Sequence, residues 1–189
     1  MCMRKSWFNF FANGVQELCV RMQTNPAHQI LPGVWLGNRI ASQDGKWLRD
    51  TQIGAIFNCT KNLPFIHGTK IHMYRIPVDD NLQEDEIRNL QHWSWEIIYK
   101  ITNERTSGNR ILIHCAAGMQ RSAAVTAMYL ISHYRCTTDE AIAYIKSKRP
   151  IAFFGNANFY MSIKQFENSF RKMISEKGEY EKYPRIPLP

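Results

Sequence analysis

The sequence predicts an α/β protein with a central mixed, mostly parallel sheet that is flanked by helices on both faces. Short apolar runs of strand length alternate along the chain with longer segments whose apolar residues recur at helical spacing. Such an alternation is typical of sheets that helices cover on both faces. The chain has 189 residues and is 44% hydrophobic, so we expect one main domain with a substantial core.

The first predicted elements lie before residue 51. Residues 6–24 carry apolar side chains at steps of three and four, which predicts an amphipathic helix that ends before Pro26. Residues 29–38 predict two short strands separated by a Pro-Gly turn, and residues 40–50 can form a helix. The helix at 6–24 could cover its own domain or pair with a second copy of the chain in a symmetric homodimer.

Two strands and a long helix are expected next. The segments 54–59 and 70–78 are rich in β-branched and aromatic residues, which favour strands. Residues 84–101 predict a helix, because their apolar residues share one face and acidic residues crowd the N-terminus, where the helix dipole favours them. Residues 110–114 form the next predicted strand, and their apolar run indicates a buried position.

Three further helices are predicted after that strand. Residues 122–134 are apolar, residues 137–148 open with a capping-box pattern and stop before Pro150, and residues 157–175 form the last long helix. The strand at 110–114 passes directly into a loop and then a helix N-terminus. In open α/β sheets this is the place where ligands bind.

Composition excludes several classes of protein. No stretch approaches 18 apolar residues, so no membrane span is expected, and the apolar stretch near the N-terminus is too short for a signal peptide. The net charge of +8 favours anionic partners in general. Lys and Arg are scattered without a long basic run, so nucleic acid is disfavoured as a partner.

The cysteines indicate a reducing compartment. Five cysteines stand far apart without a C-x-x-C pair, so neither a disulfide framework nor a structural zinc site is expected. A location in the cytoplasm, with the nucleus as the alternative, fits this pattern, and there a single cysteine can serve as a reactive thiol.

The segment HCAAGMQRS, which follows the strand at 110–114, carries the chemistry. Its backbone N–H groups can curl into one ring, and the following helix adds its dipole, so the ring can hold an anion. Gly118 permits the tight curvature because it accepts dihedral angles that other residues resist. The N–H groups of this phosphate cradle would come from Ala116, Ala117, Gly118, Met119, Gln120 and Arg121.

A thiol and a guanidinium flank this cradle. Cys115 lies at its base, where N–H groups and a helix N-terminus lower the pKa of a thiol, so that Cys115 would be a thiolate at neutral pH. Arg121 can bind two phosphate oxygens at once with its planar fork. A thiolate beneath a bound phosphate faces phosphorus in line with the leaving oxygen, which predicts nucleophilic phosphoryl transfer.

At this point the chain resembles a known family. His114-Cys115-Ala-Ala-Gly118-Met-Gln-Arg121-Ser122 resembles the H-C-x-x-G-x-x-R-[ST] signature of cysteine-dependent protein tyrosine phosphatases. The segments ILPGVWLGN and AIFNCT are similar to strand motifs of the dual-specificity phosphatase branch. GNANFYMSIKQFE resembles the P-N-x-x-F-x-x-Q-L-x-x-[FY]-E helix of that branch, with three replacements at Gly155, Ser162 and Ile163.

The resemblance implies a domain organisation. It runs from about residue 29 to residue 172. Residues 1–25 would form an N-terminal amphipathic helical extension, residues 26–176 the dual-specificity phosphatase catalytic domain, and residues 177–189 a loose tail that contains prolines.

The resemblance also implies a general acid, usually placed as I-P-x-x-D. The segment IPVDDN assigns this role to Asp80, with Asp79 as the alternative. An alkoxide or phenoxide leaves poorly unless it is protonated as it departs, so the chemistry requires such a group. The same two residues could also simply cap a loop.

The implied catalytic cycle has two steps. Cys115 attacks phosphorus while Asp80 protonates the leaving oxygen, and Asp80 then acts as the base for the water that splits the phosphocysteine. Ser122 would hydrogen-bond the departing sulfur, and His114 would order the loop without transferring a proton. The cycle requires no cofactor, and the sequence has no metal-ligand cluster.

These observations predict a phosphoprotein phosphatase that hydrolyses phosphotyrosine and phosphoserine or phosphothreonine. The variable cradle positions are uncharged, which argues against inositol lipids as substrates. An RNA 5′-phosphatase of the same superfamily remains an alternative because of the charge of +8. A non-catalytic phosphate-binding module is a further alternative, although such modules usually lose the Cys, the Arg or the acid.

Overall fold

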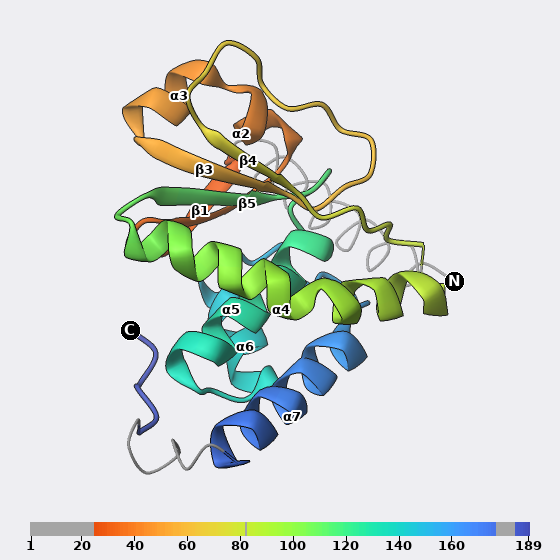
Figure 1. The fold of residues 1–189 in the computed structure, drawn as a ribbon. Coiled ribbons are helices and arrows are strands. Elements are labelled where there is room, and N and C mark those ends of the chain that lie inside the picture. Colours follow the sequence, from red (N-terminus) through yellow and green to blue (C-terminus); the bar gives the residue numbers. More distant parts are fainter. Residues whose placement is uncertain (1–24, 82, 177–183) are drawn as a thin grey trace, which may run out of the picture.

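A five-stranded sheet forms the centre of the fold in the computed structural model, which describes residues 25–81, 83–176 and 184–189 (Figure 1). The strand order is β1-β2-β5-β3-β4. In chain order the strands are β1 Ala27–Leu31, β2 Val34–Gly37, β3 Ile53–Asn58, β4 His72–Arg75 and β5 Arg110–His114.

Strand directions in this sheet are mixed but mostly parallel. Strands β1 and β2 pair antiparallel, whereas β2–β5, β5–β3 and β3–β4 pair in parallel. His114 at the end of β5 lies opposite Gly37 of β2 and Asn58 of β3. The carboxyl ends of these three strands therefore meet at one edge of the sheet, and the loop after β5 begins there.

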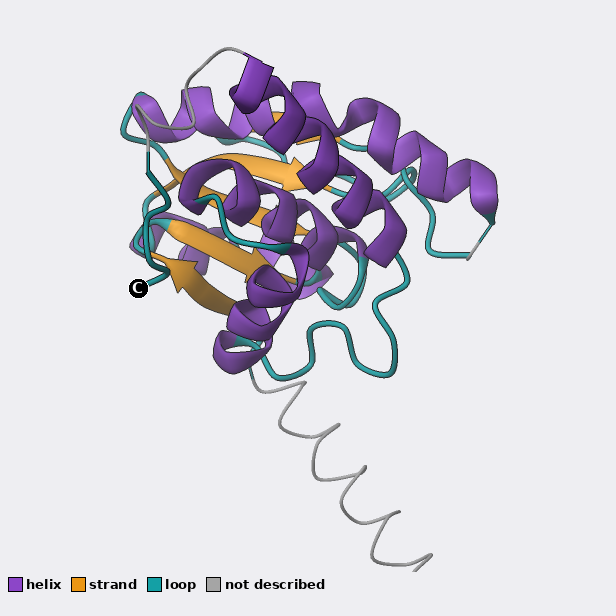
Figure 2. Cartoon of the chain, turned by 90° about the horizontal axis from the view of Figure 1, so that it is seen from below, coloured by secondary structure: helices purple, strands orange, loops and turns teal. Residues whose placement is uncertain are grey.

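Helices cover both faces of the sheet, as the sequence predicts (Figures 1 and 2). On one face, Leu112 of β5 joins a small core with Leu48 and Ile56. On the other face, Ile111 and Ile113 belong to the main core. The short helices α2 Arg39–Gln43 and α3 Gly45–Asp50 lie on the first face, and α4 Glu84–Thr106, α5 Arg121–Tyr134, α6 Thr138–Lys148 and α7 Tyr160–Glu176 lie on the second.

The single helix expected at 40–50 is wrong, because this segment forms α2 and α3. Asp44, between them, has φ −82° and ψ 89°, which is not helical. Its carboxylate accepts the backbone N–H of Trp47 at 2.9 Å and so caps α3. A capping side chain favours a new helix start over continuation of the old helix.

Other element boundaries differ by a few residues. Strand β4 covers only four residues of the segment 70–78, and the chain then leaves the sheet as the loop at 76–81. Pro77 has no N–H for a strand ladder, which favours this early exit. Helix α4 extends five residues beyond the expected end at residue 101, and α7 begins three residues after the expected start at 157.

The structure describes the last six residues of the chain but not the first 24. The predicted helix at 6–24 and the homodimer assigned to it lie outside the described residues. Of the predicted tail at 177–189, the structure describes residues 184–189. The Ile186 N–H donates to the carbonyl of Tyr134 at 3.2 Å, and Arg185 pairs with Glu140 at 2.6 Å.

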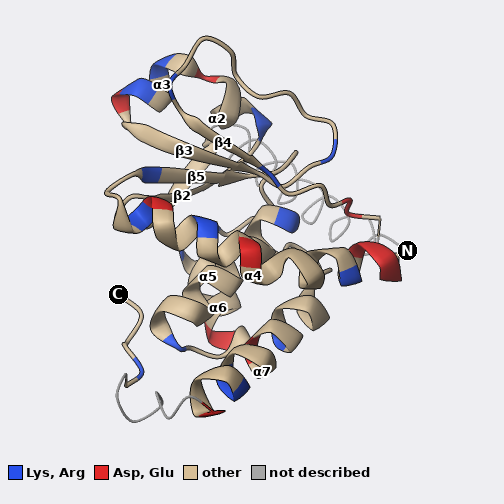
Figure 3. Cartoon of the chain, in the orientation of Figure 1, with Lys and Arg blue, Asp and Glu red and all other residues tan. Residues whose placement is uncertain are grey.

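Charged residues are spread over the described elements. Figure 3 shows Lys and Arg on several helices and strands, interspersed with Asp and Glu. Within the described ranges, no helix combines the length and apolarity that crossing a bilayer requires.

Candidate active site

Cys115 lies directly after β5, at the edge where three parallel strands end. Its side chain is buried, with only 2% of the residue exposed. Helix α5 begins six residues later, at Arg121, so the expected strand–loop–helix is present and the helix starts one residue earlier than predicted.

The carbonyl groups of the loop after Cys115 point outward. Four consecutive carbonyls each accept a hydrogen bond from a donor outside the loop, which leaves the N–H groups to line its inner side. The pairs are Arg39 N–H to Ala116 at 3.2 Å, the Arg149 guanidinium to Ala117 at 3.4 Å and to Gly118 at 2.9 Å, and Phe153 N–H to Met119 at 2.9 Å. The predicted anion cradle is therefore built from outside as well as from its own turn.

Gly118 fits the cradle for two reasons. Its φ of +69° lies in the left-handed region, which favours glycine. A Cβ atom there would also lie 2.5 Å from the carbonyl oxygen of Gly37, at the end of β2. The cradle thus packs against the sheet so closely that only glycine fits.

Hydrogen-bond donors converge on the sulfur of Cys115. Gly118 N–H and Ser122 Oγ each donate to Sγ at 3.2 Å. Burial raises the pKa of the thiol, but donors from Ser122 and Met119 and the charge of Arg121 outweigh it, so the pKa of Cys115 lies below its ordinary value. The geometry favours a thiolate at the base of the cradle.

Arg121 joins the cradle to the loop at 76–81. Its Nη1 donates to the Val78 carbonyl at 3.2 Å and lies 3.9 Å from Oδ1 of Asp79. Its buried Nε has no partner among the described residues. An oxygen of a bound phosphate could supply the acceptor that Nε lacks.

His114 is buried and neutral beneath the cradle. Desolvation lowers its pKa to about 4, although a hydrogen bond to the Cys115 carbonyl at 3.4 Å opposes the shift. Its own carbonyl accepts the N–H of Cys59, at 2.7 Å, from the end of β3. These contacts support the predicted ordering role of His114, which remains a prediction.

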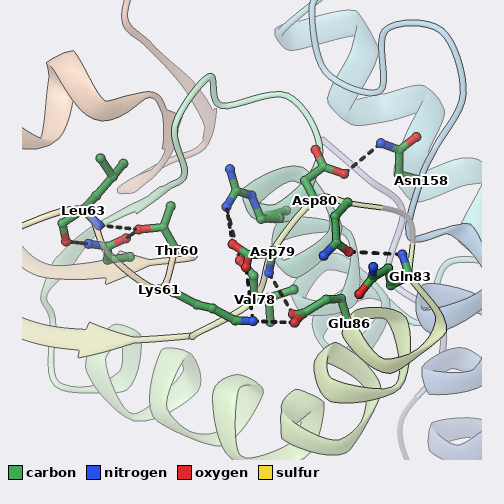
Figure 4. Close-up of polar contacts among 12 residues, drawn as sticks. Thr60, Lys61, Leu63, Val78, Asp79, Asp80, Gln83, Glu86 and Asn158 are labelled. Carbon is green, nitrogen blue, oxygen red and sulfur yellow. Dashed lines mark hydrogen bonds and ion pairs between the residues drawn. The ribbon is translucent and has the colours of Figure 1, made fainter.

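The two candidate acids have different partners (Figure 4). Asp79 forms an ion pair with Lys61 at 3.1 Å and lies near Arg121, and its N–H donates to Glu86 at 2.9 Å. Asp80 is exposed, and its Oδ1 accepts a hydrogen bond from Asn158 Nδ2 at 2.8 Å. Asp79 is thus engaged by cations, whereas Asp80 is bound through one oxygen by a neutral amide.

Arg149 is a part of the site that the sequence reasoning missed. The residue is 1% exposed, and its guanidinium contacts the carbonyls of Ala117 and Gly118 and the ring of His28. Burial lowers its pKa to about 10. A basic residue immediately before Pro150, next to an apolar segment, was the only available signal.

Lys61, Glu86 and Asn158 were also missed. They lie in three segments that the sequence places far from each other and from the cradle. No sequence spacing relates them, because the fold brings them together around the loop at 76–81. Among the described residues, no group of three or more His, Cys, Asp or Glu is placed to hold a metal ion.

Comparison with known proteins places the chain among phosphatases. Residues 34–169 match the family "Dual specificity phosphatase, catalytic domain". Human dual specificity protein phosphatase 2 is 34% identical over 140 residues, which are 74% of this chain and 43% of that protein. The tyrosine-protein phosphatase vhp-1 of Caenorhabditis elegans is 32% identical over 172 residues, 89% of this chain and 25% of that protein.

Solved structures share the fold. Human DUSP28 aligns with a TM-score of 0.67 at 24% identity, over 78% of this chain and 96% of that one. DUSP15 aligns with a TM-score of 0.68 at 26% identity, over 80% of this chain and 96% of that one.

The match concerns the catalytic domain. The chain spans less than half the length of the curated dual specificity relatives it matches, such as 43% of human phosphatase 2. The matched residues 34–169 nevertheless contain β2 to β5, the cradle, the loop at 76–81 and most of α7. On this evidence the chain belongs to the dual specificity phosphatase family.

Proposed function

We propose that this chain is a cysteine-dependent phosphoprotein phosphatase that hydrolyses phosphotyrosine and phosphoserine or phosphothreonine through a phosphocysteine. One observation carries the proposal: the Cys115 thiol, with a lowered pKa, lies at the base of a loop whose outer carbonyls are engaged by surrounding donors. Inward N–H groups and a thiolate together suit attack on a bound phosphate. The family membership supports the same chemistry.

The first step forms the phosphocysteine. The Cys115 sulfur attacks phosphorus while the bond from phosphorus to the substrate oxygen breaks, and Asp80 gives its proton to that oxygen. The cradle N–H groups and Arg121 hold the three oxygens of the transferring group.

The second step restores the enzyme. Asp80 takes a proton from water as the water oxygen attacks phosphorus, and the bond between sulfur and phosphorus breaks. The Oγ of Ser122, which is 3.2 Å from the sulfur, stabilises the departing thiolate. Inorganic phosphate is the product.

Phosphoproteins are the proposed substrates. The curated relatives are named as protein phosphatases. The variable cradle positions carry no charged side chain, so the site offers no extra cation for a polyphosphorylated ring. The absence of a long basic run in the sequence favours a protein over RNA, because RNA-binding proteins concentrate Lys and Arg in a patch or stripe. We place the activity in the cytoplasm or nucleus, where a thiolate stays reduced.

A panel of phosphate esters tests the proposal with the full chain. We expect phosphate release from phosphotyrosyl and phosphothreonyl peptides, and little from RNA with a 5′-triphosphate or from a phosphoinositide vesicle. Faster turnover of the RNA would favour the RNA 5′-phosphatase alternative. Binding of inorganic phosphate without turnover of any ester would favour the non-catalytic module.

A further inference from the structure

We propose that Asn158 is a positioning residue for the general acid of this chain, an inference that rests on the proposed function. Its Nδ2 donates to Oδ1 of Asp80 at 2.8 Å. Figure 4 shows the side chains of Asp80 and Asn158 pointing toward each other, while Asp79 points to other partners. Asn158 lies in the segment that precedes α7, far from Asp80 in the sequence.

The cradle itself holds Asn158 in place. The backbone N–H of Asn158 donates to Oε1 of Gln120 at 3.1 Å. The Nε2 of Gln120 donates to the carbonyl of Asn156 at 2.8 Å and to that of Phe154 at 3.3 Å. Gln120 is a buried cradle residue directly before α5. The side-chain amide of Gln120 therefore makes three hydrogen bonds to the segment at 154–158, which fix the position of Asn158 relative to the cradle.

The backbone next to Asp80 is held separately. The N–H of Asp79 donates to Oε2 of Glu86 at 2.9 Å, and Lys61 contacts the carboxylates of both residues. The hydrogen bond from Asp79 lowers the pKa of Glu86, with Lys61 as a further cause. With the main chain held at the neighbouring residue, Asn158 has only to orient the Asp80 side chain.

The hydrogen bond from Asn158 gives the two carboxyl oxygens of Asp80 different roles. In a protonated carboxyl group the carbonyl oxygen is a better acceptor than the hydroxyl oxygen, so the amide contact at Oδ1 favours placing the proton of the acid form on Oδ2. In the first step Oδ2 releases this proton to the leaving oxygen as the ester bond breaks. In the second step Oδ2 accepts a proton from the attacking water. Oδ1 keeps its bond to Asn158 in both steps, so the carboxyl group does not need to rotate between them.

The link is a feature of this sequence and not of the motif. In the pattern P-N-x-x-F, Asn156 occupies the specified Asn position and Asn158 a position that the pattern leaves open. An amide at this open position provides the donor, and an apolar side chain could not.

The test compares Asn158→Ala with wild type in the full chain, on phenyl phosphate and on para-nitrophenyl phosphate. Phenoxide is the poorer leaving group and depends more on the acid. We expect kcat/KM on phenyl phosphate, which reports the first step alone, to fall about 10- to 30-fold, part of the roughly 10²–10⁴ that loss of a general acid costs. On para-nitrophenyl phosphate we expect a loss of less than about threefold, because that leaving group needs less help.

Two further variants separate positioning from stability. Asn168→Ala removes the same amide from an exposed position on α7 and should leave both esters unaffected. In an Asp80→Asn background, Asn158→Ala should reduce turnover no further, because the group it positions is already lost.

The outcomes are distinct. Equal losses of kcat/KM on both esters, or a further loss in the Asp80→Asn background, would overturn the role of Asn158 and leave the proposed function standing. A wild-type chain that turns over neither ester would overturn the proposed function, and the role of Asn158 with it.

Discussion

The cradle at 115–121 and the loop at 76–81 contact each other through Arg121 but are held in different ways. Main-chain groups build the cradle, and its carbonyls are paired with donors from the surrounding fold. The loop at 76–81, here called the acid loop, buries Ile76 and Val78 but exposes Asp80, and side chains from three separate segments hold it. The proposed nucleophile is therefore positioned by a local turn that main-chain contacts and Arg149 brace, whereas the proposed acid depends on side chains that the fold brings together.

The largest expected effect is at the base of the cradle. Cys115→Ser should lower kcat on para-nitrophenyl phosphate by more than about 10⁴, as loss of a nucleophile does in other enzymes. Inorganic phosphate should still raise the melting temperature of the variant, because the N–H groups remain. Cys136→Ser is the control, since burial raises the pKa of that thiol to about 11. Activity of Cys115→Ser within about tenfold of wild type would refute the mechanism.

The next effect distinguishes the two carboxylates of the acid loop. Asp80→Asn should lower turnover of a phosphotyrosyl peptide by about 10²–10⁴, because the leaving oxygen loses its proton donor. Asp79→Asn should cost far less, since Asp79 pairs with Lys61. Steady-state kinetics of the two variants give the answer. A larger loss for Asp79→Asn would show that the acid has been assigned one residue too late.

A backbone substitution should show how rigid the cradle is. Gly118→Ala should lower the free energy of unfolding by about 4 kcal/mol, since strain at positive φ and a clash with the Gly37 carbonyl add together. Gly108→Ala is the matched control, because its φ is +84° and, its two chain neighbours aside, no atom of the described residues lies within 4 Å of the added Cβ. We expect it to cost about 1 kcal/mol. Urea unfolding of both variants measures the difference, and equal losses would contradict the clash.

The smallest expected effect is that of His114 on the stability of the fold at acidic pH. Burial lowers its folded pKa from 6.5 to about 4, so the folded state keeps the ring neutral while the unfolded state takes up a proton. The neutral ring makes its full contribution to the free energy of unfolding above pH 6.5. This contribution, at most about 3 kcal/mol, is lost as the pH falls to about 4. His114→Asn should flatten the dependence of unfolding free energy on pH in this window. If denaturant titrations gave the same dependence on pH for the variant and the wild type, the pKa of His114 would be the same in the folded and unfolded states.

The sequence by itself determined the parts of the site that lie within one short segment. Cys115, Gly118, Arg121 and Ser122 follow one another in a strand–loop–helix, so their spacing was sufficient to predict the cradle. The alternation of strands and helices likewise predicted the mixed sheet and its two helical layers. Local order of this kind depends on neighbours a few residues apart, which a sequence displays directly.

Only the tertiary structure decided what surrounds the cradle. Arg149 beneath it, the Lys61 and Glu86 contacts with Asp79, and the Asn158 contact with Asp80 all join segments distant in the chain. Polar side chains such as these give no periodic signal, because a solvated surface residue and a paired one look the same in sequence. Parallel strands ending at one edge bring the segments together, and the polar groups that approach one another there form these hydrogen bonds and ion pairs.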